Sequence, residues 1–364
     1  MRIVYGAFAQ GHGHFSKAAV LVPLLESRGH DVCVVSSGPQ RPPHGYRFRR
    51  HRHFPGLAYL AAGGRVQYGR SAVTWLAELP LVLGHLRTLR HVVREFEPDL
   101  IVSDFEPLTA SPWLRPECEV VALSRQAALI DPGVPLPDGA EFEQKLTRSV
   151  IRLFTAGADR LLGYHYAPES HRCLPPIVRP DVLQGRPERG DHLLVYNHFH
   201  AGDGGTAAEL VDWAWRNGRR VCAYGFPEAQ RGRHGPVEFR PADRRTFVAD
   251  LRTARAVVTS AGFTTPLEAF VLRKPVVVVA LPRQWEQRVN AFHVEDAGLA
   301  AQCARWDFSR ALELPEPAAS HPLLSWLTTP PEQVVEFLLD GCENPAPATA
   351  PASPLTAAVR LHAA

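Results

Sequence analysis

A polar turn at residues 260–265 joins an apolar, strand-like run to a helix that Pro266 opens. Gly262 lets the backbone approach a ligand closely, and the helix start offers free N–H groups at the positive end of its dipole. Two threonine hydroxyls add further donors, so the turn suits a diphosphate. The candidate diphosphate-binding residues are Ser260, Ala261, Gly262, Phe263, Thr264 and Thr265.

A second interpretation of this turn needs no ligand. The sequence Thr-Pro-Leu-Glu at residues 265–268 fits a capping box with proline at the first helical position. In the first interpretation Glu268 instead accepts hydrogen bonds from sugar hydroxyls. The residues alone leave both interpretations open.

A second polar loop, Arg-Gln-Trp-Glu-Gln at residues 283–287, follows the apolar run at 276–281. A strand, a helix and a strand of this length predict parallel pairing. The ligands of parallel sheets lie beyond the carboxyl ends of the strands. Both polar loops lie at that edge, so they can face one ligand.

A third turn, Gln-Gly-His-Gly-His at residues 10–14, separates a predicted strand at 2–8 from a predicted helix at 15–27. A dinucleotide site is excluded here, because Ser16 occupies the third glycine position and the next strand ends without an acidic residue. The spacing of a P-loop is also absent. From the residues alone, His14 either takes part in catalysis or caps the helix.

The turns lie in two separate regions of the chain, and in each region predicted strands and helices alternate. We expect a first domain at residues 1–166, a proline-rich linker at 167–190 and a second domain at 191–342. Residues 343–364 are rich in alanine and proline and have little to bury, which predicts a disordered tail. The fold class is therefore α/β, with two Rossmann-like domains.

Composition excludes several classes of protein. The 40 basic and 37 acidic residues leave a net charge of +3, which gives no case for nucleic acid as a partner. The six cysteines form no CxxC pair, which favours free thiols in a reducing compartment. The N-terminus has no signal-peptide h-region, and no apolar run reaches the roughly 20 residues of a membrane-spanning helix. We expect a cytoplasmic protein.

The C-terminal half carries a long ordered motif in three pieces. They are SAGFTTPLEA at residues 260–269, KPVVVVALP at 274–282 and QWEQRVNA at 284–291. The motif resembles the donor-site signature HxGxxTxxEA…GxPxxxxPxxxDQxxNA of nucleotide-sugar glycosyltransferases with the GT-B architecture. The chain looks most similar to the bacterial branch that includes the N-acetylglucosaminyltransferase of peptidoglycan synthesis. The resemblance implies two Rossmann-like domains facing a central cleft, with the acceptor on the first and the donor on the second.

The resemblance also implies roles for single donor-site residues. Residues 260–265 would hold the diphosphate, and Glu268 would bind the ribose hydroxyls. Phe239 and Arg240 correspond to the segment that contacts the base. The diphosphate histidine of many members is Ser260 here, as in the peptidoglycan branch.

The second loop corresponds to the part of the donor site that holds the sugar. Glu286 and Gln287 match the Asp-Gln pair of the family, and Asn290 would brace that loop. The aspartate of the pair is glutamate in this chain. That departure leaves the identity of the sugar open.

In the family a histidine after the first strand is the general base. Counting back from the Arg-Gly-His at residues 28–30 places this role on His14 rather than on His12. Imidazole is a proton acceptor near neutral pH, and a carboxylate should orient it. Asp104, at the end of a predicted strand, is the first choice for that carboxylate, and Glu106 is the second. Other turn residues expected to line the cleft are Gly11, His12 and Gly13.

His198 and His200 flank the first loop of the second domain and either touch phosphate across the cleft or simply end a strand. No HExxH motif or His/Cys ligand spacing predicts a zinc site. Asp-x-Asp is also absent, so we expect no metal, with the helix start neutralising the diphosphate. No cofactor is expected beyond the co-substrate, a UDP- or TDP-sugar.

The acceptor is less well defined by the sequence. A basic run at residues 47–53 and an apolar helix near 75–83 allow a lipid acceptor and peripheral contact with an anionic membrane. They equally allow a small hydrophobic molecule. The basic run also fits a solvated loop or an edge strand.

We therefore expect an inverting, metal-independent transfer of a sugar from a nucleoside-diphosphate sugar to an acceptor hydroxyl. Two alternatives share the fold. A nucleotide-sugar 2-epimerase would turn over the donor without an acceptor, and a non-catalytic subunit would bind the donor only.

Overall fold

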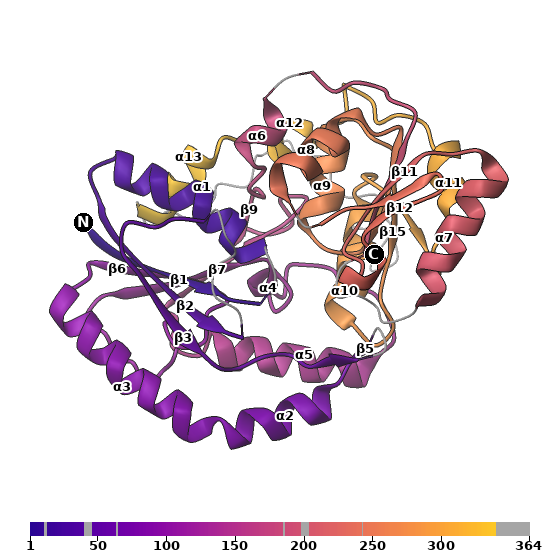
Figure 1. Ribbon diagram of the computed structural model, residues 1–364. Helices are drawn as coiled ribbons and strands as arrows, with labels where there is room; N and C mark the ends of the chain where they lie inside the picture. The colour runs from indigo at the N-terminus through magenta and orange to yellow at the C-terminus, as the bar shows by residue number, and fades with distance from the viewer. Residues whose placement is uncertain are drawn as a thin grey trace, which may run out of the picture.

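A computed structural model of the chain contains two large β-sheets with helices packed on their faces (Figure 1). The first has seven strands within the described residues, in the order β3-β2-β1-β6-β7-β8-β9, and all pairings are parallel. These are β1 (Arg2–Phe8), β2 (Asp31–Gly38), β3 (His51–Pro55), β6 (Leu100–Asp104), β7 (Glu119–Ser124), β8 (Arg160–Tyr164) and β9 (Cys173–Leu174). The structure describes residues 1–10, 13–39, 46–62, 65–184, 186–197, 204–241 and 243–339.

Helices cover both faces of this sheet because alternate residues of a strand point to opposite sides. Tyr5 of β1 shares a buried cluster with Leu21 of α1, whereas its neighbour Val4 shares one with Leu89 of α3. The helices of this half are α1 (Gly13–Ser27), α2 (Tyr68–Ala77), α3 (Leu79–Phe96), α4 (Arg125–Ala128) and α5 (Glu141–Phe154). Helix α6 (Pro180–Leu183), in the connection, packs against the second half, where Val182 joins a buried cluster. A short hairpin, β4 (Ala61–Ala62) and β5 (Arg65–Val66), precedes α2.

The second sheet has the order β12-β13-β11-β10-β14-β15-β16, and β12 is its antiparallel strand. Its strands are β10 (Leu193–Tyr196), β11 (Val221–Tyr224), β12 (Gly232–His234), β13 (Val237–Phe239), β14 (Ala256–Ser260), β15 (Val276–Val279) and β16 (Ala301–Cys303). Its helices are α7 (Gly204–Asn217), α8 (Arg244–Thr253), α9 (Thr264–Val271), α10 (Trp285–Asp296), α11 (Phe308–Glu313) and α12 (Leu324–Leu327). The last described helix of the chain is α13 (Pro331–Leu339).

The predicted α/β fold with two Rossmann-like domains is confirmed by these two sheets. The domain boundaries stay predictions, and the structure differs from them in two respects. Helix α13 falls in the predicted second domain but packs on α1 of the first, where Val334 and Leu338 join its buried cluster. The predicted linker at 167–190 contains β9 and α6 and buries Val182. The predicted tail at 343–364 lies outside the described residues.

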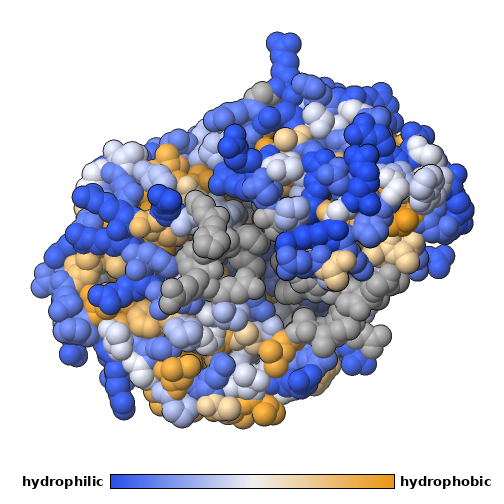
Figure 2. All heavy atoms as spheres, viewed as in Figure 1, coloured by the Kyte–Doolittle hydropathy of each residue, from blue (hydrophilic) through white to orange (hydrophobic). Residues whose placement is uncertain are grey.

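Apolar side chains are exposed along α2 and α3. Figure 2 shows apolar groups at the lower edge of the molecule, where Figure 1 places these two helices. Among the described residues no helix combines the length and the apolar character needed to cross a bilayer. The described cysteines are free thiols, as predicted. The large apolar side chains exposed on α2 and α3 are Val73, Leu76, Leu79, Leu81 and Leu83.

Helix α4 follows β7 directly and lies tightly against β8. A Cβ atom at Gly163 of β8 would lie 2.5 Å from the backbone nitrogen of Ala128, so only glycine permits this approach. The contact fixes the position of α4. It therefore also fixes the two polar residues at the start of that helix, Arg125 and Gln126.

The substitution Gly163→Ala is expected to lower the free energy of unfolding by about 1–3 kcal/mol, because the added methyl group overlaps the backbone of α4. Urea denaturation followed by circular dichroism measures the change. Gly84→Ala in α3 is the control, since a Cβ atom there meets nothing within 4 Å and alanine favours a helix. Equal stability of Gly163→Ala and the wild type would contradict the close packing of α4.

Candidate active site

His14 and Asp104 meet at the carboxyl edge of the first sheet. Strands β1 and β6 pair in parallel with Ala7 opposite Asp104, so the end of β6 lies beside the turn that leads into α1. His14 Nδ1 lies 2.8 Å from Asp104 Oδ1, and Asp104 is fully buried. The other ring nitrogen, Nε2, has no hydrogen-bond partner within the described chain. His14 therefore does not cap the helix; its ring is oriented by a carboxylate.

Lys17 binds the same carboxylate. Its Nζ atom lies 2.8 Å from Asp104 Oδ1, the oxygen that His14 also contacts. Burial alone would raise the pKa of Asp104, but the Lys17 ammonium and then His14 hold this pKa below its ordinary value. Lys17 was not among the site residues predicted from the sequence. Its spacing of three residues from His14 was the available signal, because the two share a helix face once the helix begins at Gly13.

Glu106, the second choice for this carboxylate, has a different role. It accepts hydrogen bonds from the Ser37 hydroxyl and from the backbone N–H groups of Leu108, at 3.1 Å, and Thr109, at 2.7 Å. It therefore holds the loop after β6. The residue between the two acids, Phe105, has a left-handed backbone with φ of 57°.

Aromatic side chains form a wall beside His14. The Phe105 ring stacks on the His14 ring with 6.2 Å between centroids, and the Phe8 ring meets the His14 ring edge-on at 6.1 Å. Phe154 packs on Phe105 at 5.2 Å, and Trp75 packs on Phe154 at 5.6 Å. The histidine therefore packs on an aromatic cluster, called here the aromatic wall, in which Phe8, Phe105 and Phe154 are buried and Trp75 is half-buried at the edge.

The turn at residues 260–265 joins β14 to α9 at the carboxyl edge of the second sheet. Helix α9 begins at Thr264, and its N-cap residue, Phe263, makes no side-chain capping hydrogen bond. Pro266 is the third residue of the helix, so the predicted capping box with proline at the first position is wrong. A Cβ atom at Gly262 would meet only Ser260 O, at 4.0 Å. The helix start therefore borders open space at Gly262.

Glu268 is bound by an arginine from the connection between the domains. Arg179 Nε lies 2.6 Å from Glu268 Oε1, and Arg179 Nη2 lies 2.5 Å from Glu268 Oε2. Both side chains are buried. Glu268 thus binds Arg179 instead of the backbone N–H that a capping box would give it. Contact of Glu268 with a ribose stays a prediction. Arg179 was missed because it lies in the predicted linker.

Glu286 and Gln287 lie in the first turn of α10, not in a loop. Gln126 Nε2, from the first domain, donates to Glu286 Oε1 at 3.1 Å. Burial raises the pKa of Glu286, and the nearby His14 only partly offsets this. Gln287 is turned inward, and its Oε1 accepts from the backbone N–H of Leu281 at 3.0 Å. Of the predicted sugar pair, Glu286 faces the first domain and Gln287 holds the loop.

Asn290 braces the diphosphate turn rather than the loop at 283–287. Its Nδ2 donates to Ala261 O at 3.2 Å, and its Oδ1 accepts from Arg125 Nε at 3.0 Å. The buried Arg125 guanidinium also lies 5.0 Å from the centroid of the Phe263 ring. The first domain therefore positions the turn at 260–265. Arg125 and Gln126 were missed, although two polar residues after a predicted strand end were a usable signal.

The predicted base-contacting residues are engaged elsewhere. Phe239 is buried in the core of the second sheet. Arg240 Nη1 lies 2.7 Å from Asp250 Oδ2, and Arg240 Nη2 lies 3.1 Å from Glu238 Oε2. Gly13 is the first residue of α1. The other predicted cleft residues, Gly11, His12, His198 and His200, lie outside the described residues.

Within the described ranges one group of side chains has the ligand types of a metal site, with its donor atoms within 4.8 Å. It comprises His192, Cys222 and Asp250. His192 Nε2 lies 3.0 Å from the backbone oxygen of Asp250, and the Asp250 carboxylate binds Arg240 and Tyr224. The imidazole of His192 and the carboxylate of Asp250 are thus already engaged by other partners.

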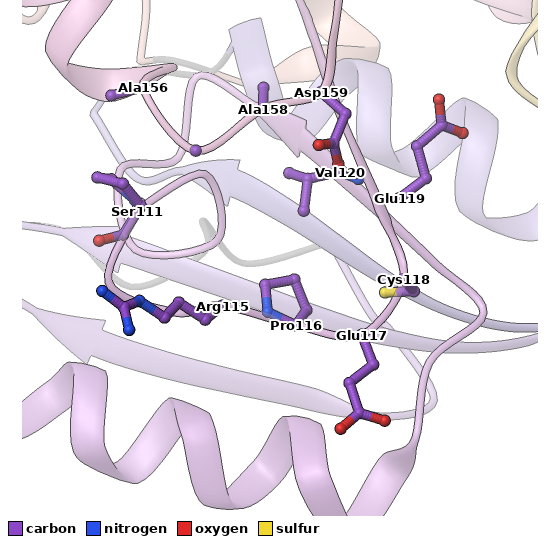
Figure 3. Close-up of a pocket in the computed structure, with 12 residues that line it drawn as sticks. Ser111, Arg115, Pro116, Glu117, Cys118, Glu119, Val120, Ala156, Ala158 and Asp159 are labelled. Atoms are coloured by element: carbon purple, nitrogen blue, oxygen red, sulfur yellow. Dashed lines mark hydrogen bonds between the residues drawn. The ribbon is translucent and has the colours of Figure 1, made fainter.

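A surface depression of about 640 Å³ lies apart from the residues described above (Figure 3). Residues 111–112, 115–120 and 156–159 line it, beside the first residues of β7 and β8. Ligands of parallel sheets bind beyond the opposite, carboxyl ends of the strands. We therefore place the candidate site at His14 and the turn at 260–265.

The basic run at 47–53 leads into the edge strand β3, which agrees with the edge-strand interpretation. Arg50 Nη1 lies 2.7 Å from Asp31 Oδ2. His51 Nε2 and His53 Nδ1 both lie 2.9 Å from Ser36 Oγ. Several of these groups thus bind neighbouring side chains.

Comparison with known proteins gives a consistent result. Residues 1–312 match the family model described as Glycosyl transferase family 1. No curated protein sequence matches the chain.

Solved glycosyltransferase structures resemble the whole chain. SsfS6 of Streptomyces sp. SF2575, complexed with thymidine diphosphate, has 15% identity and a TM-score of 0.58 over 93% of this chain and 99% of that one. SnogD from Streptomyces nogalater has 17% identity and a TM-score of 0.52 over 100% and 99%. Phytolacca americana UGT2, complexed with UDP-2fluoro-glucose and pterostilbene, has 13% identity and a TM-score of 0.57 over 100% and 98%. This likeness confirms the predicted GT-B fold.

The substitution Arg179→Met is expected to lower the free energy of unfolding by about 3–5 kcal/mol, because the buried Glu268 carboxylate loses its partner. Combining it with Glu268→Gln removes the unpaired charge and should restore part of the loss. Urea denaturation measures all variants.

Arg310→Met is the control for this substitution, since it breaks an exposed ion pair with Glu313 and should cost less than about 1 kcal/mol. If Arg179→Met and Arg310→Met cost the same, the Arg179–Glu268 pair does not stabilise the fold.

Proposed function

This chain belongs to glycosyl transferase family 1, and we propose that it transfers a sugar from a TDP- or UDP-sugar to the hydroxyl of a small hydrophobic acceptor. The proposed reaction is a single inverting displacement that needs no metal ion. The observation that carries the proposal is the His14–Asp104 pair, whose Nε2 has no partner among the described residues. The helix start at residues 260–265 lies on the other domain and supplies the site for the diphosphate.

In the proposed mechanism the acceptor hydroxyl gives its proton to His14 Nε2 as its oxygen attacks the anomeric carbon. The bond from that carbon to the diphosphate oxygen breaks, and the diphosphate leaves with the electron pair. N–H groups at the start of α9 and the hydroxyls of Thr264 and Thr265 stabilise the charge that develops there. Asp104 stabilises the imidazolium that forms. One displacement inverts the anomeric carbon.

Two solved neighbours support a pyrimidine nucleoside diphosphate as part of the donor. SsfS6 was crystallised with thymidine diphosphate, and Phytolacca americana UGT2 with UDP-2fluoro-glucose. In this chain the turn at 260–265 has the open glycine and the uncapped helix start that such a diphosphate requires. Glu286, which interacts electrostatically with His14, is the proposed contact for the sugar hydroxyls.

The aromatic wall supports a small hydrophobic acceptor. Phe8 and Phe105 pack on the His14 ring but are buried, whereas Tyr59 and Trp75 are half-buried at the edge of the same cluster. An acceptor whose hydroxyl reaches Nε2 would bring its apolar body against this half-buried edge. Phytolacca americana UGT2 was crystallised with pterostilbene. The exposed apolar residues of α2 and α3 are the feature that would favour a lipid acceptor at a membrane.

Incubation with TDP- and UDP-sugars and a panel of phenolic and lipid acceptors is expected to yield glycosylated phenols in solution. Mass spectrometry identifies the products, and proton NMR of the anomeric coupling shows inversion. Transfer that occurs only with anionic vesicles would contradict the small-acceptor proposal. Donor turnover without any acceptor would favour the 2-epimerase instead.

The substitution His14→Ala is expected to lower kcat by about 10²–10⁴-fold, because the acceptor hydroxyl loses its proton acceptor. Affinity for TDP or UDP, measured by isothermal titration calorimetry, should stay unchanged. His91→Ala is the control, since His91 is an exposed histidine on α3. Wild-type turnover in His14→Ala would assign the role of base to another group.

A further inference from the structure

We propose that Lys17 is a positioning residue that extends the His14–Asp104 pair to a Lys–Asp–His arrangement. In this arrangement the ammonium balances the buried carboxylate and keeps the imidazole neutral, and so able to accept a proton, in more acidic solution. The inference rests on the proposed function of His14 as the general base. It concerns one residue that neither the sequence motif nor the family comparison singles out.

The geometry places both cations on one oxygen. Lys17 follows His14 by three residues on α1, so the two side chains share a face of the helix. Lys17 Nζ and His14 Nδ1 each lie 2.8 Å from Asp104 Oδ1. Lys17 is largely buried, with its Nζ 5.0 Å from the centroid of the Tyr164 ring. The other carboxylate oxygen, Oδ2, is buried and has no hydrogen-bond partner among the described residues.

Charge balance gives Lys17 its effect. A buried carboxylate is costly unless a cation balances it. In a pair of histidine and aspartate, only a protonated imidazole can do so, and the carboxylate therefore favours protonation of the base. In this chain the Lys17 ammonium already balances the Asp104 carboxylate. Protonation of His14 would therefore place a second positive charge beside a carboxylate whose charge is already balanced.

The other groups around Asp104 do not replace Lys17. Burial, and then the charge of Asp104, raise the pKa of Tyr5 on β1 and Tyr164 on β8, so both hydroxyls stay neutral. From α10, burial raises the pKa of Glu286, and from α4 Arg125 is bound to Asn290 rather than to Asp104. Phe8 and Phe105, which contact the His14 ring, are uncharged.

The test measures kcat/KM against pH for the wild type, Lys17→Met and Lys17→Arg. In Lys17→Met the pH of half-maximal activity on the acidic side is expected to rise by about 1 unit, with the plateau at high pH kept within a few-fold. Lys17→Arg keeps the charge and should keep the wild-type profile. Lys145→Met, which removes an exposed lysine of α5, is the control and should leave the profile unchanged.

A second readout does not depend on turnover. The His14 ring signal in protein labelled with ¹³C-histidine, assigned by its loss in His14→Ala, is followed through a pH titration. Its midpoint should be higher in Lys17→Met than in the wild type. If Lys17→Met does not fold, Lys17→Gln takes its place in both measurements.

The outcomes separate the two proposals. An equal loss of kcat/KM at every pH, with an unchanged His14 titration, would show that Lys17 only supports the fold and would overturn the inference. An unchanged pH profile would overturn it as well. A wild-type protein without transferase activity would refute the proposed function, whereas a shifted His14 titration in that protein would still support the electrostatic role of Lys17.

Discussion

The buried carboxylate of Asp104 is the charge on which the first half of the site depends. It has no exposure to water, so its partners must come from the protein. Both partners come from the first turns of α1, and this fixes the rotation of that helix about its axis. The parallel pairing of β1 with β6 then sets the distance between the helix start and the carboxylate. The Asp104 carboxylate therefore determines where the His14 ring lies and which of its two nitrogens is available.

The second half of the site depends on the first half for its shape. The diphosphate turn is held through Asn290 by Arg125, which belongs to the other domain. Tyr166, at the predicted end of the first domain, donates from its hydroxyl to Phe263 O at 2.9 Å. Gln126 binds Glu286 in the same way across the domains. The carboxyl edges of the two sheets thus meet through polar contacts, and the donor turn has the shape described here only while they do.

Sequence patterns predicted the elements well, because apolar runs and glycine turns act over short distances. The strand at 2–8, the helix that follows the turn at 10–14 and the turn at 260–265 all follow from neighbouring residues. They also placed His14 and Asp104 at one edge, since parallel strands bring their carboxyl ends together.

Two other contacts between residues far apart in the chain were not predicted. Lys17 reaches Asp104 across 87 positions, and Arg179 reaches Glu268 across 89. The capping box at 265–268 failed because α9 begins at Thr264, with Phe263 as its N-cap residue. Glu268 instead forms a buried ion pair with Arg179 through two charge-assisted hydrogen bonds, and no short pattern reveals such a partner.

The return of α13 to the first domain gives the molecule a particular mechanical property. The chain passes between the two sheets once through residues 167–190 and again before Pro331. Two domains joined by two separate chain segments rotate most easily about the line through both connections. They resist twisting about other axes and sliding. Any opening and closing of the domains would therefore follow one axis, and each closure would bring the two carboxyl edges back to the same contacts.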